Sequence, residues 1–475
     1  MKRRIDLIIC TAMVAFACGC ASGPQLDVLA RSEVKTDFEW QEAQKREFPS
    51  YKKGFALDRF KAWRAKQDNP PFVVGASKVD ITPANPQWLA GFGPNRKQVG
   101  VHSRIYATTV FMDDGKNSLV LTSCDLIGFL MELPDAIRPM ITADYQKDVI
   151  LAATHSHAAP DTLGIWGPAI ARMVPVQSGK DPAYWSFLKS RIVQGINEAI
   201  ANARPARLKY ATVTVPDGVS KNIYTEVRYY KDDLLVAIKA EDEKGANIAT
   251  LVNYSMHPEV LSDMNHRLSS DWPGFMYESI QRNWGGVAML VTGDLGGNVT
   301  GDINREQPVF EKEIFIKKAG TYLGDLTRQA LDEHGVYLDG KKIEHVWSPV
   351  EFTMDSNTFK TAFKMGLLKR DVDFKARKII SEVHAMRIGG LSFVTAPGEI
   401  FPSLGKSVRE YAATKGAKAT VIVGLSPEEL AYMMTPEEFK NPLFAYDAEV
   451  SLGEGVGNAW LDAAKKLFDK LGEAK

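Results

Sequence analysis

The chain has 475 residues, of which 45% are hydrophobic and 24% are charged, a composition typical of a folded globular protein. Lysine plus arginine equals aspartate plus glutamate, at 58 each, so no net charge attracts the chain to nucleic acid or to another polyanion. At roughly 150 residues per domain the length allows about three domains. We find no internal repeat and no Ser/Gly linker within residues 72–475, which favours one large domain there.

The N-terminus has the pattern of a targeting signal. Basic residues at positions 2–4 precede a short apolar run at 7–16, and Ala-Cys-Gly-Cys follows it, ending at Cys20. This pattern resembles a bacterial lipoprotein signal, and the run is shorter than the about 20 residues that a membrane span needs. We therefore expect residues 1–19 to be a signal peptide and Cys20 to carry lipid that attaches the protein to a membrane of the bacterial cell envelope. Only Cys124 would then remain in the folded part, so no intramolecular disulfide is expected.

The chain after Cys20 changes character at Phe72. Residues 20–71 are polar and loosely helical, and we interpret them as a tether and a helical preamble. From Phe72 on, short β-branched runs such as SLVLTSCD, VILAAT, IATLVNY, VAMLVTG and LSFVTAP alternate with stretches of helical periodicity. The clearest predicted helices are 184–203, 311–333, 401–414 and 458–471. This alternation predicts an α/β fold over residues 72–475, with a mixed central β-sheet flanked by helices.

Two histidines, His155 and His157, lie one residue apart directly after the predicted strand VILAAT. If the strand continues through them, both rings point to the same face. Imidazole is a common zinc ligand, so the pair is a candidate for one metal ion, or for one ligand and its support. The alternative is an ordinary polar turn at the end of a strand, and the motif alone leaves both interpretations open.

Other polar side chains also follow predicted strands. His257 follows IATLVNYSM, a glycine-rich turn with Asp294 and Asn298 follows VAMLVTG, and Glu399 follows LSFVTAPG. The turn is either a set of N–H donors for an oxyanion or simply a tight connection that glycine permits. Because sites in open α/β sheets form beyond the carboxyl ends of strands, these segments are expected to share a cleft.

Taken in order, these segments resemble the neutral/alkaline ceramidase family, zinc amidases that cleave the N-acyl bond of ceramide. The resemblance covers about residues 72–455. Its motifs are VGASKVDITPANPQWLAGFG, VGVHSRIYA, SCD, THSHAAPD, MHPEVLS, LSSDWPG, APGEIF and AYMMTPEEF.

The resemblance implies a zinc site whose ligands are His155, His257, Glu399 and Tyr432, a chemically sound set for Zn²⁺ that leaves room for water. It implies that His157 lies beside the metal and acts on the bound water or on the substrate carbonyl. Tyr446 corresponds to a second tyrosine of the family. His157 or one of the tyrosines, Tyr432 or Tyr446, would steady the tetrahedral oxyanion, and no organic cofactor is required.

The sequence departs from the family pattern in two places. The family turn Gly-Asp-x-Ser-Pro-Asn carries Gly296 and Gly297 at its serine and proline positions, and an Asn-Arg pair of the family is represented by Asn222 and Ile223, with Arg228 nearby. We also expect this chain to lack the C-terminal β-sandwich of longer members. These departures bear on the substrate more than on water attack at a metal.

Three functional hypotheses follow. The first is a zinc-dependent amidohydrolase that acts on ceramide or a related N-acyl lipid. The second is a metal-dependent esterase or phosphoesterase, in which a more acidic two-metal site would use Asp125, Asp271, Asp294 and Asp302. The third is a non-catalytic envelope lipoprotein that binds a ligand, for which the departures at Gly296 and Ile223 are the main support.

Overall fold

The computed structural model describes residues 57–170, 174–224 and 230–471. The predicted signal peptide, Cys20 and Arg228 lie outside these residues. The first helix described is α3 (Leu57–Arg64), whose Phe60 packs edge-on against Phe111 with ring centroids 5.8 Å apart. Within the described residues, no helix combines the length and apolarity required to cross a membrane.

A mixed nine-stranded sheet lies at the centre of the fold. Its strands are β1 (Val73–Asp80), β3 (Tyr106–Asp113), β4 (Ser118–Cys124), β5 (Val149–Ala153), β8 (Arg204–Thr214), β10 (Leu234–Asp242), β11 (Asn247–Tyr254), β13 (Val287–Thr292) and β15 (Val336–Tyr337). The order is β13-β11-β10-β8-β1-β3-β4-β5, with β15 beside β8. The pairs β4–β5 and β11–β13 are parallel and the others are antiparallel. The predicted hairpin-like neighbours at 105–112 and 118–125 are the antiparallel pair β3–β4.

A second, four-stranded sheet packs against one face of the first. Its strands are β16 (Ile343–Thr353), β17 (Lys378–Ile388), β18 (Leu391–Thr395) and β20 (Ala419–Val423), in that order. The apolar layer between the sheets includes Val74 and Ala76 of the large sheet and Phe393 and Val421 of the small one. Side chains of β1 alternate between the two faces, so Val73 instead faces the helices.

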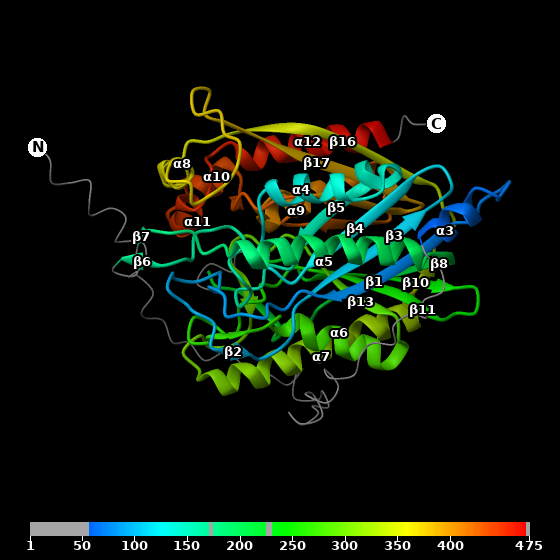
Figure 1. Ribbon diagram of the computed structural model, residues 1–475, viewed down its shortest axis with the longest axis horizontal. Coiled ribbons are helices and arrows are strands. Elements are labelled where there is room, and N and C mark those ends of the chain that lie inside the picture. The colour runs from blue at the N-terminus through cyan, green and yellow to red at the C-terminus, as the bar shows by residue number, and fades with distance from the viewer. Residues whose placement is uncertain (1–56, 171–173, 225–229, 472–475) are drawn as a thin grey trace, which may run out of the picture.

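Helices cover the two outer faces. They are α5 (Pro182–Ala201), α6 (Trp272–Trp284), α7 (Val309–His334), α9 (Pro402–Thr414) and α12 (Val456–Leu471). In Figure 1, α12 runs along the top and α6 and α7 along the bottom. Helix α5 packs on β1 and β3, α7 on β8 and β10, and α9 and α12 on the small sheet. The fold class and the four predicted helices are confirmed, and the second sheet is a layer that the sequence analysis did not include.

Shorter elements connect these layers. They are β2 (Gly100–Val101), α4 (Glu132–Ile137), β6 (Ala169–Ile170), β7 (Val174–Pro175), β9 (Ser220–Asn222), β12 (Arg267–Leu268), β14 (Val299–Gly301), α8 (Asn357–Lys364), β19 (Glu399–Ile400), β21 (Tyr432–Met433), α10 (Pro436–Lys440) and α11 (Ala445–Glu449). The described residues also include 3₁₀ turns at Arg138–Met140, Ala143–Asp148 and Pro442–Phe444. The parallel pair β19–β21 aligns Glu399 with Tyr432.

The two edges of the large sheet meet, although β5 and β13 are at opposite ends of the strand order. The Ser123 hydroxyl donates to the Leu290 carbonyl at 2.6 Å, and the Thr292 hydroxyl donates to the Thr154 carbonyl at 3.0 Å. The backbone N–H of Gly424, just after β20, donates to the Thr292 carbonyl at 2.8 Å. This closure gathers the segments that follow β5, β13 and β20 in one place.

Candidate metal centre

Three histidines come together beyond the strand ends. His155 and His157 follow β5, and His257 follows β11. One ring nitrogen from each of the three lies within 4.8 Å of the other two, and all three side chains are buried. Among the residues described, these three histidines form the group of potential ligands whose spacing could hold a metal ion.

The turn after β5 differs from the sequence expectation. The strand ends at Ala153 instead of continuing through the two histidines, and His155 has a φ of 72°, which is uncommon for a residue other than glycine. Its backbone N–H donates to the Leu126 carbonyl at 2.9 Å. The rings of His155 and His157 still approach one another, with centroids 4.7 Å apart. The turn, and not strand alternation, therefore brings the two rings together.

Glu399 lies between two of these histidines. Its Oε1 is 3.4 Å from Nε2 of His155 and its Oε2 is 2.9 Å from Nε2 of His257. Two atoms that are each about 2.1 Å from a tetrahedral ion are about 3.4 Å apart. The separation between Glu399 and His155 matches that of two ligands of one zinc-sized ion, and the contact with His257 is shorter, at hydrogen-bond length.

The far side of each ring is anchored on backbone. Nδ1 of His155 donates to the Ile127 carbonyl at 2.6 Å, and Nδ1 of His257 donates to the Val299 carbonyl at 2.8 Å. A carbonyl only accepts, so these bonds keep a proton on Nδ1 and leave Nε2 as the ring nitrogen that faces Glu399. Metal-binding histidines are oriented by such bonds in proteins.

The charges of the group depend on one another. Burial alone would raise the pKa of Glu399, but His155 and His257 outweigh it and lower that pKa to about 2. Burial alone would lower the pKa values of His155 and His257, but the effect of Glu399 is larger, so both pKa values are raised. Glu399 is therefore an ionised carboxylate at neutral pH, which is the form that binds a metal.

Of the two predicted tyrosines, Tyr432 pairs with Glu399 across β19 and β21, and Tyr446 lies beside Tyr432. Tyr432 is buried, and its hydroxyl donates to Asn298 Oδ1 at 3.3 Å. Burial, and then Glu399, raises the pKa of Tyr432 well above its ordinary value, so the side chain is a neutral phenol. Tyr446 is 43% exposed on α11, with its ring 6.2 Å from that of Tyr432. The roles of both tyrosines stay predictions.

His157 has a different environment from the other two histidines. Neither of its ring nitrogens has a hydrogen-bond partner among the described residues. Nδ1 lies 3.6 Å from Oε2 of Glu259, and Phe92 packs edge-on against the ring at a centroid distance of 5.1 Å. Burial, followed by the charges of His155 and His257, lowers the pKa of His157 well below its ordinary value. His157 is therefore a neutral imidazole beside the group.

Two acidic residues near the centre were missed by the sequence analysis. Glu259 comes two residues after His257, and burial would raise its pKa, but Arg305 and His257 outweigh burial and lower it. Glu429 is buried, its Oε2 has no hydrogen-bond partner in the part of the chain that the structure describes, and burial followed by Glu399 raises its pKa to about 8. The sequence gives little indication that these two residues belong to a site, because each lies in a loop with no periodic pattern around it.

The glycine-rich turn after β13 is a tight connection. The N–H of Gly296 donates to the Ile400 carbonyl at 2.9 Å, so it is not directed at a substrate oxygen. A Cβ at this position would lie 2.6 Å from the carbonyl oxygens of both Glu399 and Ile400. Gly297 has a φ of 70°, whereas proline requires about −65°. The glycines in place of the family's serine and proline thus match this backbone.

The four aspartates of the phosphoesterase hypothesis have other partners. Asp125 accepts from the Tyr277 hydroxyl at 2.9 Å, and Asp271 accepts from the first N–H of α6 at 2.8 Å. Asp294 binds Arg409 through two bonds of 3.0 Å, and Asp302 lies 3.4 Å from Lys221. In the described part of the chain these carboxylates form no group with metal-ligand spacing.

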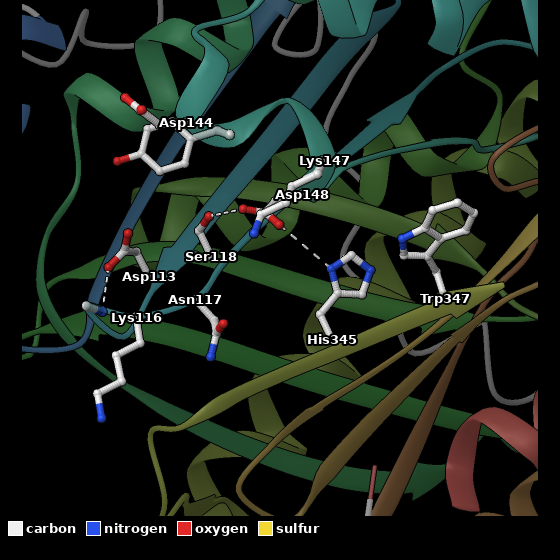
Figure 2. Close-up of a pocket in the computed structure, with 11 residues that line it drawn as sticks. Asp113, Lys116, Asn117, Ser118, Asp144, Lys147, Asp148, His345 and Trp347 are labelled. Carbon is white, nitrogen blue, oxygen red and sulfur yellow. Dashed lines mark hydrogen bonds and ion pairs between the residues drawn. The ribbon is translucent and has the colours of Figure 1, made fainter. Parts of the chain in front are cut away.

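A cavity of about 330 Å³ lies at the other end of β4 and β5. Ser118 and Asp148, at the amino ends of these strands, line it together with His345 and Trp347 of β16 (Figure 2). His155 follows the carboxyl end of β5, so this cavity is separate from the histidine group.

Part of the sequence matches a known family. Residues 72–288 match the family described as neutral/alkaline non-lysosomal ceramidase, N-terminal. The neutral ceramidase of Mycobacterium tuberculosis is 22% identical over 269 residues, which are 50% of this chain and 42% of that protein. Neutral ceramidase B of Dictyostelium discoideum is 24% identical over 226 residues, 43% of this chain and 31% of that one. The aligned region thus spans less than half the length of these curated relatives.

Solved structures show the same fold over more of the chain. A ceramidase complexed with C2 superposes with a TM-score of 0.71 at 18% identity, covering 85% of this chain and 75% of that one. The neutral ceramidase from Pseudomonas aeruginosa superposes with a TM-score of 0.67 at 18% identity, covering 84% and 75%. The resemblance stated from the sequence motifs is confirmed by these matches.

Proposed function

From the resemblance of residues 72–288 to the neutral/alkaline ceramidases, we propose that this chain is a zinc-dependent amidohydrolase that cleaves the N-acyl amide bond of ceramide or a related N-acyl lipid. The observation that carries the proposal is the position of Glu399 between Nε2 of His155 and Nε2 of His257, at 3.4 Å and 2.9 Å. Carbonyl anchors behind both rings and the buried setting support the same conclusion.

In this proposal His155, His257 and Glu399 hold the ion, with Tyr432 as the fourth ligand. Zinc bound there would supply a water of near-neutral pKa and an electrophile for the scissile carbonyl. His157 is neutral, so it can accept a proton from the attacking water and return it to the leaving amine nitrogen. Tyr446 is half-exposed beside Tyr432 and is suited to donate its hydroxyl proton to the developing oxyanion.

The test combines metal analysis with a panel of N-acyl lipids of varied head group. We expect one zinc per wild-type chain and release of fatty acid and free amine. His257→Ala should lose both the metal and the activity. His384→Ala is the matched control, because His384 is equally buried but binds His345 and Glu382 outside the group.

Two results would contradict this proposal. Activity retained by a metal-free His257→Ala protein would exclude the zinc mechanism. Two ions per chain about 3.5–4 Å apart, with phosphoester cleavage, would favour the phosphoesterase hypothesis.

The proposed location is the bacterial cell envelope, with the chain attached through lipid on Cys20. The support is the sequence pattern at residues 2–20. Mass spectrometry of the N-terminal peptide should find a diacylglycerol-modified Cys20, and Cys20→Ser should release the protein from the membrane fraction. An unmodified Cys20 in a membrane-free protein would refute this location.

A further inference from the structure

Glu259 presents a buried carboxylate to His157. The residue is 8% exposed, and its Oε2 lies 3.6 Å from Nδ1 of the His157 ring. His157 has no carbonyl anchor of the kind that His155 and His257 have, and both of its ring nitrogens lack a hydrogen-bond partner in the described residues. Glu259 is therefore the acceptor available to orient this ring.

Arg305 fixes the other side of the carboxylate. Its Nη2 donates to Oε1 of Glu259 at 2.8 Å, while half of the Arg305 side chain is exposed. Thr300 also hydrogen-bonds to the Glu259 carboxylate, and Oε2 faces Nδ1 of His157 at 3.6 Å. The Glu259 carboxylate thus lies between two side chains, the Arg305 guanidinium and the His157 imidazole.

A backbone hydrogen bond holds His157 next to the segment that carries Glu259. The N–H of His157 donates to the carbonyl of Pro258, the residue before Glu259, at 3.0 Å. The His157 carbonyl accepts from Nη2 of Arg96 at 2.9 Å. Gly91 lies against the ring, where a Cβ would come within 2.3 Å of Cγ of His157. The imidazole therefore has little freedom, and its Nδ1 faces Oε2 of Glu259 at 3.6 Å.

We propose that Glu259 is a positioning residue that accepts the Nδ1–H of His157, and that Arg305 holds Glu259 in place for this purpose. The tautomer selected in this way carries its lone pair on Nε2. In histidine–carboxylate pairs the carboxylate sets the tautomer and stabilises the imidazolium that forms during the reaction. Such contacts are often long in a free enzyme and shorten in the complex with substrate. The catalytic consequence rests on the proposed function, whereas the tautomer itself does not.

The first test measures the tautomer without any substrate. The full-length protein, loaded with zinc and labelled with ¹⁵N-histidine, contains only eight histidines, and His157→Gln identifies the signal of His157. We expect the Nδ1–H tautomer in the wild type and a shift toward the Nε2–H tautomer in Glu259→Ala. A wild-type ring protonated at Nε2, or an unchanged spectrum in Glu259→Ala, would overturn the proposal.

The second test asks whether Glu259 acts through His157. Glu259→Ala should lower kcat by about 10²–10⁴-fold, by analogy with carboxylates that orient a catalytic histidine, with KM and zinc content almost unchanged. In a His157→Ala background the same change should cost no further activity. Additive losses, or a loss of zinc in Glu259→Ala, would overturn the proposal.

Glu382→Gln provides the matched control, because Glu382 also lies between an arginine, Arg138, and a histidine, His384, but outside the metal centre. It should leave the His157 spectrum and kcat as in the wild type. If the wild-type protein cleaves no N-acyl amide at all, the proposed function fails, while the ring-nitrogen spectrum still decides the role of Glu259.

Discussion

Replacing Gly296 by alanine is expected to push strand β19 away from the metal centre. The added Cβ would lie 2.6 Å from the carbonyl oxygens of Glu399 and Ile400, while a Cβ in a protein does not come closer than 3.0 Å and normally keeps 3.4 Å or more. Strand β19 or the turn must therefore move by about 0.4–0.8 Å. Because Glu399 is on this strand, its carboxylate moves with it.

Both stability and metal binding report this displacement. An added methyl group in a well-packed region costs about 1–3 kcal/mol in the free energy of unfolding. Metal sites are similarly sensitive, since lost support of a ligand lowers affinity by about 10–100-fold. We therefore expect Gly296→Ala to show both losses, and Gly296→Ser, which restores the family's residue, to behave like alanine because its Cβ occupies the same position.

The assays are urea unfolding and zinc titration of the metal-free protein. Gly93→Ala is the matched control, since a Cβ at Gly93 would meet no atom within 4 Å and this glycine has no positive φ. Gly93→Ala should unfold and bind zinc like the wild type. If Gly296→Ala does the same, the close approach of this turn to β19, and the argument from it to Glu399, are wrong.

Two further predictions concern the histidines and the acid dependence of stability. His155→Ala should empty the metal site, whereas His157→Ala should keep zinc and lose activity, as metal analysis and turnover of the same preparations will show; equal zinc loss in both would make His157 a ligand. The pKa of Glu382 is lowered to about 2, because His384 and Arg138 outweigh its burial. Since its unfolded pKa is about 4.3, Glu382 stabilises the fold above that pH, and this stability is lost as the pH falls toward 2. The free energy of unfolding should therefore fall less between pH 5 and 3 in Glu382→Gln than in the wild type, and equal slopes would refute this reasoning.

The strand-end argument located side chains that the structure brings together. His155, His257 and Glu399 each follow a predicted strand, and all three lie in one buried group. The strand-end positions are readable from the sequence, but the reason they meet is not: His155 and His257 follow strands of the large sheet and Glu399 follows β18 of the small sheet, so the packing of the two sheets brings them together. Their role as zinc ligands stays a prediction, as do the roles of Tyr432 and Tyr446.

Other features depend on contacts that no local pattern records. The second sheet and the meeting of β5 with β13 arise from packing between segments more than a hundred residues apart. The Arg305–Glu259 pair is equally non-local, and Glu259 alone resembles any loop carboxylate. The left-handed turn at His155 could not be read from β-branched alternation either, because that pattern stops at Ala153.

The predicted metal ligands lie far apart in the sequence, and their order matters during synthesis of the chain. The region that matches the family, residues 72–288, contains His155 and His257, but Glu399 and Tyr432 are translated more than a hundred residues later. A chain still emerging from the ribosome therefore has the two histidines but lacks the carboxylate that lies between them. In the proposed zinc site, binding through all the predicted ligands requires residue 432, so it would follow the synthesis of every strand of both sheets.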